Sequence, residues 1–533
     1  MKTKPSYYIT TPIYYVNAEP HLGHAYTSVM ADVQARLRRA MGFDVLFLTG
    51  TDEHGEKVAK AAAEHNMTPQ EWCDAQVPAF KTLLDLLNIT NDDFIRTTQE
   101  RHIQAVQKLW EVLKERGYLY KDTYDGWYCV PEETYFTETQ VAHADEKRGQ
   151  KGAHLCPDCG RPLERVQEES WFFKLSAFQE PLLKLYETNP HFIEPEIRRN
   201  EVVSFVKGGL KDLSVSRTSF DWGIPLPFAE KHITYVWFDA LINYLTAAGF
   251  GSDSEEFAYR WPANAQLIGK DILRFHCVIW PAMLMAADIE VSDEVFVHGF
   301  LLMKDDKTGD ETKMSKSLGN VITPQSVVDL IGVDGFRYFF MSNIKPGADG
   351  SISWDRMAQV YNTDLANSWG NLVSRTLNMS AKYFENKVPG PVAGWPDNSN
   401  PLKDIACGLV DRYTHALYTF AYDKALAEVF ELIHAANHYI EEMEPWALAK
   451  SEETKPQLQE VILNLLEAIR IAALLLSPVM PQTSQEALQR FGQEGTESLV
   501  DKTLDEAVAW GNLLLEQPVV KGDALFPRLD INA

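Results

Sequence analysis

The first 115 residues alternate between segments with the hydrophobic pattern of a β-strand and segments with that of an α-helix. Residues 6–15 are rich in aromatic and β-branched side chains, a pattern that predicts a β-strand. Apolar side chains then recur at helical spacing from Leu22 to Leu37, residues 44–48 form a short apolar strand, and an alanine-rich helix follows near residues 57–65. This alternation predicts a doubly wound parallel sheet, with ligands bound at the carboxyl ends of its strands.

The pattern changes along the rest of the chain. In residues 116–225, aromatic strand-like runs alternate with charged turns, which predicts an α+β segment inserted into the sheet domain. The α/β pattern returns in residues 226–300, which complete the Rossmann-like sheet begun in residues 1–115. Residues 361–533 carry apolar stripes at helical spacing and predict a C-terminal all-α bundle, which leaves residues 301–360 between sheet and bundle.

Composition narrows the class of protein. The chain of 533 residues has no apolar run of about 18 residues, so no membrane span is expected. Its N-terminus enters the first strand without the apolar core of a signal peptide, and its six cysteines do not suggest a disulfide scaffold. Both features predict a cytoplasmic protein. The formal net charge of −25 argues against nonspecific polyanion binding, so any bound nucleic acid must meet local basic or aromatic patches.

Two histidines lie at the predicted start of the first long helix. His21 and His24 are three residues apart, so they share one face of the first helical turn, directly after Pro20. Backbone N–H groups and the helix dipole favour an anion there, and imidazoles can donate hydrogen bonds to phosphate oxygens. The alternative interpretation is two surface histidines at a helix start.

A second polar motif, Lys-Met-Ser-Lys-Ser, occupies residues 313–317. The ammonium groups of Lys313 and Lys316 suit a pyrophosphate whose charge grows during a reaction, and a loop can close over a site when substrate is bound. A solvated surface loop is the alternative. Together the two motifs suggest a site that binds a nucleoside triphosphate while its α-phosphate is attacked. No Gly-x-Gly-x-x-Gly motif is present, so a nicotinamide enzyme has no support.

In this order, the two motifs resemble the signatures of class I aminoacyl-tRNA synthetases, and the surrounding segments narrow the resemblance to the methionyl family. The segments that carry the resemblance are Thr-Thr-Pro-Ile-Tyr-Tyr-Val-Asn at 10–17, Gly-Thr-Asp-Glu-His-Gly at 50–55, Ser-Arg-Thr-Ser-Phe-Asp-Trp-Gly-Ile-Pro at 216–225, Tyr-Val-Trp-Phe-Asp-Ala at 235–240 and Gly-Lys-Asp at 269–271. They span residues 5 to about 375 in family order, while the helical remainder matches more loosely.

The resemblance implies ATP-dependent ligation of L-methionine to tRNA(Met), including initiator tRNA, through methionyl-adenylate, with release of AMP and pyrophosphate. It implies Mg²⁺ bridging the phosphates, and it makes residues 301–360 the signature loop and a stem-contact region. The catalytic groups that it implies are His21, His24, Lys313 and Lys316. The ATP contacts that it implies are His21, His24, Gly269, Asp271 and Lys316.

The resemblance also implies a methionine pocket and an anticodon site. Asp52 is expected to hold the substrate ammonium, within a pocket formed by Ile13, Tyr15, Trp237, Ala240, Leu241, Tyr244, Phe275, His276 and Ile279. Some relatives carry proline at the position of Leu241. Residues that match the anticodon readers of the family are Asn371, Arg375 and Trp446. From the residues alone, the alternative is a surface polar stripe with a packed tryptophan.

The cysteines raise the question of zinc. Cys156 and Cys159 form half of a zinc knuckle, and Cys129 is a candidate third ligand. Glu132 stands where metal-binding relatives have a second cysteine, and the possible substitutes are His143 and His154. The alternative is a reduced, empty remnant, since some relatives lack metal in this insertion.

Three other functions compete with this interpretation. A class I synthetase for leucine, isoleucine, valine or cysteine is the first, although about 110 residues is short for the editing insertion usual in the branched-aliphatic enzymes. A noncatalytic tRNA-binding paralogue would be expected to lose signature histidines or lysines, and a small-molecule nucleotidylyltransferase would not need the helical bundle. Because many relatives append a dimerising β-barrel domain and this sequence stops at the bundle core, we expect a monomer.

Overall fold

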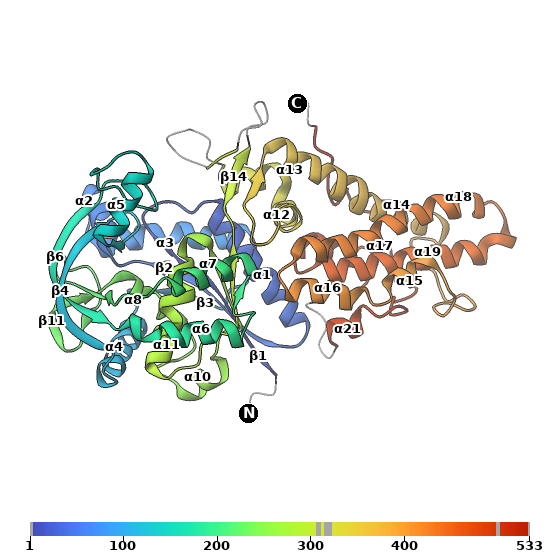
Figure 1. Ribbon diagram of the computed structural model, residues 1–533. Coiled ribbons are helices and arrows are strands. Elements are labelled where there is room, and N and C mark those ends of the chain that lie inside the picture. The colour runs from blue at the N-terminus through green and yellow to red at the C-terminus, as the bar shows by residue number, and fades with distance from the viewer. Residues whose placement is uncertain (1–3, 305–310, 314–321, 497–501, 531–533) are drawn as a thin grey trace.

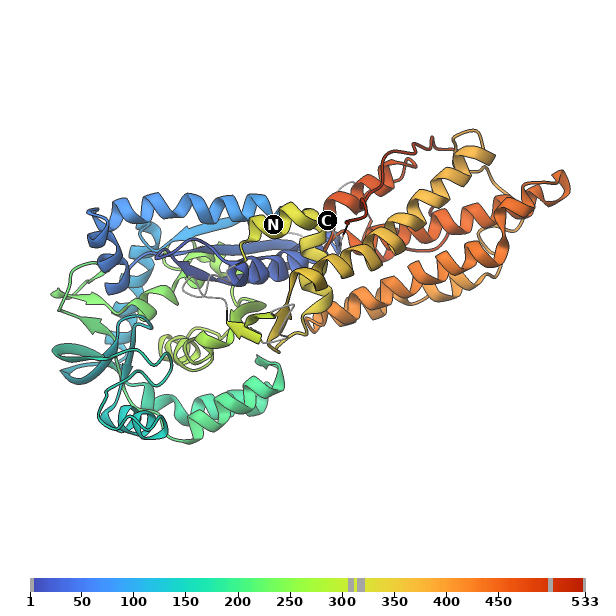
Figure 2. The same cartoon turned by 90° about the horizontal axis from the view of Figure 1, so that it is seen from above.

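The computed structural model describes residues 4–304, 311–313, 322–496 and 502–530. Figures 1 and 2 show an elongated molecule, with an antiparallel insertion at one end, a parallel sheet in the middle and a helical bundle at the other end. The central sheet has the strand order β3-β2-β1-β12-β13-β7, and every neighbouring pair is parallel. Its strands are β1 (Ser6–Tyr15), β2 (Asp44–Asp52), β3 (Asp93–Arg96), β7 (Ile193–Glu194), β12 (Ala265–Gly269) and β13 (Val295–His298).

The strand order reverses between β1 and β12. The chain runs outward from β1 through β2 to β3 on one side, while β12 and β13 extend the sheet on the other side. Such a reversal opens a crevice at the carboxyl ends of the two central strands, because the following connections leave in opposite directions. The doubly wound parallel sheet predicted from the sequence is confirmed, and β7, from within residues 116–225, adds an edge strand to it.

Helices cover both faces of this sheet. The helix α1 begins at Leu22, as its apolar spacing predicts, and packs its buried stripe against β1 and β2. The segment predicted to be an alanine-rich helix is α2. The helices of the sheet domain are α1 (Leu22–Ala40), α2 (Glu56–Glu64), α3 (Pro69–Leu86), α4 (Glu100–Glu115), α8 (Val236–Ala240), α9 (Asn243–Ala247), α10 (Ser254–Arg260) and α11 (Trp280–Ala287).

The insertion is built on an antiparallel sheet of order β5-β4-β6-β8. Its strands are β4 (Leu119–Cys129), β5 (Thr134–Phe136), β6 (Glu164–Phe173) and β8 (Leu213–Ser214), and its helices are α5 (Glu138–Lys147), α6 (Gln179–Thr188) and α7 (Glu196–Lys207). A small sheet beside it joins β9 (Ser216–Arg217), β10 (Pro225–Leu226) and β11 (Ala229–Thr234). The long β4–β6 pairing carries the insertion away from the central sheet (Figure 1).

A second small sheet connects the crevice to the bundle. It contains β14 (Leu301–Lys304), β15 (Glu311–Lys313) and β16 (Gly350–Ile352). The helices beyond it are α12 (Pro324–Asn343), α13 (Trp354–Val360), α14 (Asn371–Tyr383), α15 (Pro401–Ala406), α16 (Leu409–Tyr418), α17 (Tyr422–Met443), α18 (Pro445–Leu448), α19 (Lys455–Leu476), α20 (Pro481–Gln489) and α21 (Leu504–Ala507). Within the described residues, no helix is both long and apolar enough to cross a membrane.

One buried ion pair fixes the bundle to the sheet domain. Arg337 on α12 is fully buried and donates to Asp32 Oδ2 on α1 at 2.6 Å. The same guanidinium donates to the carbonyl oxygens of Leu87, Pro478 and Val479, so it joins α1, the end of α3 and the segment after α19. A continuous hydrophobic core runs from β1 and α1 into α17 and α19. The sheet and bundle therefore share one packed interface.

Candidate active site

A cavity of about 850 Å³ lies in the crevice between β1 and β12. It collects residues that are far apart in the sequence, because parallel strands end at the same edge of the sheet. Tyr15 and Asp52 are register partners at the ends of β1 and β2, as are Gly269 and His298 at the ends of β12 and β13. The predicted residues that line the cavity are Ile13, Tyr15, His21, His24, Asp52, Trp237, Ala240, Leu241, Tyr244, Gly269, Asp271 and His276.

Two predicted pocket residues, Phe275 and Ile279, are not among the residues that line the cavity. Both belong to a π-helical turn, Phe275–Ile279, that leads into α11. The ring of Phe275 stacks on Trp237 at 3.8 Å between centroids, so it supports the wall from behind. Ile279 is 8% exposed and belongs to the hydrophobic core. The family resemblance that suggested these two positions does not distinguish a lining residue from a supporting one.

His21 and His24 form the N-terminal cap of α1. His21 Nδ1 accepts a hydrogen bond from the Gly23 N–H at 3.0 Å, and His24 Nδ1 accepts one from the His21 N–H at 3.2 Å. The two rings stack at 3.8 Å between centroids. Because each Nδ1 accepts, a neutral ring carries its proton on Nε2. No described residue accepts from either Nε2–H, so the cap leaves both groups able to donate to a ligand.

The surroundings keep both rings neutral. Desolvation in the crevice lowers the pKa of His24 well below its usual range, and the neighbouring His21 lowers it further. Desolvation also lowers the pKa of His21, partly opposed by Asp271. Tyr14 and Phe80 pack against the His24 ring and account for its dry environment. At neutral pH the pair offers two hydrogen-bond donors rather than two positive charges.

Asp52 is a buried carboxylate at the end of β2. Its side chain is 2% exposed, and Oδ1 has no hydrogen-bond partner among the described residues. Burial raises the pKa of Asp52 well above its usual range, and the carboxylates of Asp239, Glu133 and Glu53 raise it further. An arriving ammonium group would relieve this unfavourable burial. The site therefore fits a cationic ligand at the end of β2.

Aromatic side chains form the wall next to Asp52. Tyr15 meets Trp237 edge-on at 6.1 Å between ring centroids. Tyr244 Oη and His276 Nε2 are 2.7 Å apart, and His276 Nδ1 lies 3.1 Å from the Ile272 carbonyl oxygen. Burial lowers the pKa of His276 to about 4, so this imidazole is neutral and accepts from Tyr244. The wall is uncharged and polarizable, which suits a thioether side chain.

The other half of the cavity suits a nucleotide. A Cβ at Gly269 would lie 2.4 Å from Asp271 Oδ1, so a side chain at this position would displace Asp271. Thr27 Oγ1 and His298 Nε2 are 2.7 Å apart at the same edge, and both residues line the cavity. The two signature histidines line the same cavity.

The second motif is described only in part. Lys313 ends β15, where its backbone pairs with Leu302 of β14. Leu301, the first residue of β14, lines the cavity. Lys316 and the rest of residues 314–321 lie outside the described residues. The placement of Lys316 relative to His24 therefore stays a prediction.

Sequence reasoning missed several residues at this site. Lys57 lines the cavity, and its ammonium lies 4.8 Å from the centre of the Tyr15 ring. Behind the pocket, Asp239 accepts hydrogen bonds from His54 and His102, each at 2.7 Å. His54 and Asp239 occur in segments 50–55 and 235–240, which carried the family resemblance, but only the fold shows that they meet. Burial tends to raise the pKa of Asp239, but His54 and His102 hold it below its usual range.

The three predicted cysteines converge in the insertion. The Sγ atoms of Cys129, Cys156 and Cys159 all lie within 4.8 Å of one another, and those of Cys129 and Cys159 are 3.6 Å apart. A hydrogen bond from Cys129 lowers the pKa of the Cys156 thiol to about 6. Neither His143 nor His154 belongs to this group among the described residues, and the His154 ring stacks on Trp127 instead. Three thiols at this spacing fit three corners of a tetrahedral zinc site.

The predicted anticodon residues lie on the bundle. Asn371 and Arg375 are one turn apart on α14, and Arg375 pairs with Glu441 at 2.6 Å. Trp446 on α18 is 39% exposed, so it is not the packed tryptophan of the alternative interpretation. The helices α14 and α18 lie at the part of the bundle that is remote from the sheet (Figure 1).

Taken together, a parallel sheet with this crevice, an inserted antiparallel segment and a helical bundle define a class I aminoacyl-tRNA synthetase. The family described as class I tRNA synthetases (M) matches residues 7–377. A second family, described as the anticodon-binding domain of tRNA ligase, matches residues 408–516.

Individual relatives identify the branch within this class. The chain is 46% identical to the methionine–tRNA ligase of Clostridium tetani over 532 residues, which cover 99% of the chain and 79% of that relative. It is 43% identical to the Bacillus subtilis methionine–tRNA ligase over 530 residues, which cover 98% of the chain and 78% of that relative. It superposes with a TM-score of 0.90 and 41% identity on Mycobacterium tuberculosis methionyl-tRNA synthetase in complex with methionyl-adenylate, covering 98% of this chain and 100% of that one.

The chain therefore belongs to the methionine–tRNA ligase family. Its activity is the ATP-dependent ligation of L-methionine to tRNA(Met) through a methionyl-adenylate intermediate. The fold class, the enzyme class and the reaction predicted from the sequence are confirmed.

Proposed function

We propose that the cavity binds methionine and ATP side by side, with the reacting atoms between Asp52 and the two signature histidines. Asp52 holds the methionine ammonium, and the thioether lies against the wall formed by Tyr15, Trp237 and Tyr244. Gly269 and Asp271 hold the adenosine. The observation that carries this proposal is that a buried carboxylate, whose Oδ1 has no partner among the described residues, shares one cavity with the Nε2–H donors of two histidines.

The chemistry needs no nucleophilic side chain. A methionine carboxylate oxygen attacks the α-phosphorus, the bond from that phosphorus to the bridging oxygen breaks, and pyrophosphate leaves as its Mg²⁺ complex. His21 and His24 donate to phosphate oxygens while Lys313 and Lys316 stabilise the charge on the leaving group. The terminal ribose hydroxyl of the tRNA then attacks the activated carbonyl and displaces AMP. Catalysis consists of positioning and charge stabilisation.

Exchange of labelled pyrophosphate into ATP tests these roles. Across the twenty amino acids, we expect L-methionine to support exchange far better than the others. We expect Lys316→Ala to lower the exchange rate far more than it weakens methionine binding, because the ammonium acts on charge that develops during reaction. An unchanged exchange rate in the Lys316 variant would show that this lysine has another role.

We also propose that Cys129, Cys156 and Cys159 hold a structural zinc ion. The ion would join the end of β4 to the turn that contains Cys156 and Cys159, and so stabilise the tip of the insertion. Metal analysis of the purified protein should give about one zinc per chain, and Cys156→Ser should lower this content. A zinc content near zero in protein purified without chelator would refute the site.

The bundle would read the anticodon of tRNA(Met), initiator tRNA included, through Asn371, Arg375 and Trp446. The exposed indole of Trp446 supports this role, since an unpaired base can stack on it. We further propose a cytoplasmic monomer. The domains would be residues 1–115 and 226–300 for catalysis, 116–225 for the insertion, 301–360 for the loop and stem contacts, and 361–533 for the anticodon.

A further inference from the structure

The insertion reaches the amino-acid end of the cavity through the turn between β4 and β5. At this turn, Glu133 is fully buried although it is acidic, with a left-handed φ of 47°. Its carbonyl oxygen accepts a hydrogen bond from Tyr235 Oη at 2.5 Å. Tyr235 directly precedes α8, the helix that carries Trp237. The turn therefore contacts one wall of the cavity through its backbone.

The side chain of Glu133 caps the helix α2. Its Oε1 accepts from the Lys57 N–H at 3.0 Å, while Gly55, the residue before α2, has no side chain to do so. A Cβ at Gly55 would lie 2.4 Å from this Oε1, so glycine makes room for the carboxylate. Lys57 Nζ donates to the Pro131 carbonyl oxygen at 3.2 Å and lies over the Tyr15 ring. The turn thus fixes both the backbone N–H and the ammonium group of Lys57, which lines the cavity.

Glu133 also affects the electrostatic surroundings of Asp52. Its Oε2 and the Tyr15 hydroxyl are both buried without a hydrogen-bond partner among the described residues, as is Asp52 Oδ1. Burial raises the pKa of Glu133 to about 7, although the Lys57 N–H and the Lys57 ammonium oppose this. The carboxylate in turn raises the pKa of Asp52. A cation beside Asp52 would therefore be attracted by two carboxylates.

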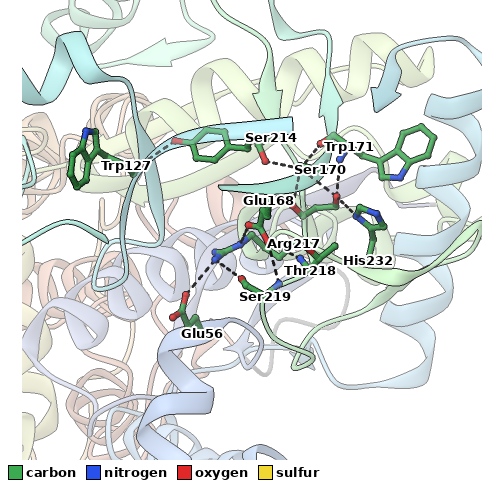
Figure 3. Close-up of polar contacts among 12 residues, drawn as sticks. Glu56, Trp127, Glu168, Ser170, Trp171, Ser214, Arg217, Thr218, Ser219 and His232 are labelled. Carbon is green, nitrogen blue, oxygen red and sulfur yellow. Dashed lines mark hydrogen bonds and ion pairs between the residues drawn. The ribbon is translucent and has the colours of Figure 1, made fainter. Parts of the chain in front are cut away.

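A separate ion-pair group secures α2 without Glu133. Arg217 is 2% exposed and pairs with Glu168 on β6 at 2.6 Å and with Glu56 on α2 at 3.5 Å (Figure 3). Glu168 also accepts from the backbone N–H groups of Thr218 and Ser219. Because this group holds the insertion to α2 independently, a conservative change at Glu133 should leave the junction folded.

We propose that Glu133 is a positioning residue for the amino-acid substrate. It holds Lys57, whose ammonium lies over the Tyr15 ring, in the cavity wall, and its carboxylate adds a second negative charge near Asp52. The insertion thereby tunes affinity for the substrate ammonium. This inference rests on the proposed role of Asp52 in binding that ammonium.

The variant Glu133→Gln tests the proposal, because it keeps an acceptor for the Lys57 N–H and removes the charge. In pyrophosphate exchange, we expect the KM for methionine to rise about tenfold, a typical size for one partly screened charge interaction. The kcat and the KM for ATP should change less than about twofold. Glu132→Gln is the matched control, since Glu132 is the exposed neighbour and should leave every constant unchanged.

A pH profile separates the charge from a merely structural role. With a pKa of about 7, Glu133 is neutral below that pH and ionised above it, so kcat/KM for methionine should rise through pH 7 in the unaltered protein. The part of this step that Glu133 contributes should be lost in Glu133→Gln and persist in Glu133→Asp, while ionisation of Asp52 continues to contribute in both variants. The titratable and charged groups that face Glu133 from the surrounding elements are Tyr15, Asp52, Lys57, Tyr128, Arg217 and Tyr235.

The Asp52→Asn variant separates the role of Asp52 from the role of Glu133. If it leaves methionine binding unchanged, the assignment of the pocket itself fails. If it weakens methionine binding while Glu133→Gln changes neither the KM for methionine nor the pH profile, only the role of Glu133 is overturned. If Glu133→Gln raises the KM for methionine and the KM for ATP equally and also lowers the Tm, the proposed role of Glu133 is overturned as well, because such a result marks a purely structural residue.

Discussion

Replacing His24 by alanine lowers the rate of methionyl-adenylate formation by about 10²–10³-fold, the usual cost of removing one preorganised donor from developing charge. The Nε2–H of His24 is free because Nδ1 is engaged in the cap of α1. Methionine binding should change less than about twofold, because Asp52 and the aromatic wall are untouched. Pyrophosphate exchange and equilibrium binding of methionine measure the two quantities.

Two amide substitutions at His24 distinguish the roles of its two ring nitrogen atoms. The amide of glutamine can place a donor near the position of Nε2, whereas the shorter asparagine can only replace Nδ1 in the cap. We expect His24→Gln to retain more activity than His24→Asn, and His24→Asn to retain more stability. His191→Ala, on the exposed surface of the insertion, is the control. Equal activity of the two amide variants would contradict the role of Nε2.

The pH dependence of this step has a definite sign. Because the pKa of His24 is lowered, the ring is neutral at and above its usual titration range and becomes charged only in more acidic solution. The role of a neutral donor therefore predicts that the His24-dependent part of the rate does not increase as the pH falls from neutral. A rate that rises with acid would indicate a charged imidazolium.

Replacing Asp52 by asparagine raises the dissociation constant of methionine by about 30-fold or more, since losing one partner of a buried charge pair costs roughly 2–5 kcal/mol. The change preserves the shape of the pocket and removes the carboxylate that faces the ammonium. Isothermal titration with methionine measures the loss. A methionine analogue without the amino group should bind both proteins alike, which serves as the control.

The same substitution should stabilise the ligand-free protein. Burial raises the pKa of Asp52, so ionisation of this side chain at neutral pH costs folding free energy that is absent when it is protonated. Asparagine removes this cost, and the Tm at pH 7 should rise while methionine binding falls. Unchanged methionine affinity would refute the ammonium site, whatever the effect on Tm.

The local elements around the site could be predicted from the sequence because their signals are short-range. The strand β1 follows from its aromatic and β-branched residues, and the helix α1 follows from apolar residues at a period of 3.6. The placement of His21 at a helix start follows from Pro20 and the apolar residues after it. The two signature motifs could also be recognised together from the sequence, because this requires only their order along the chain. The exposure of Trp446 could not be derived in this way, since it depends on how α18 ends against α19.

The sequence by itself determined the class of fold, the family and the residue types that carry the chemistry, because periodicity and motif order are properties of the chain. Only the tertiary structure decided which pocket residues line the cavity and which support it, as with Phe275 behind Trp237. It also decided that Glu133 of the insertion reaches α2 and that the three cysteines meet. These contacts join segments far apart in the sequence, and burial and charge at such contacts depend on packing that no local pattern encodes.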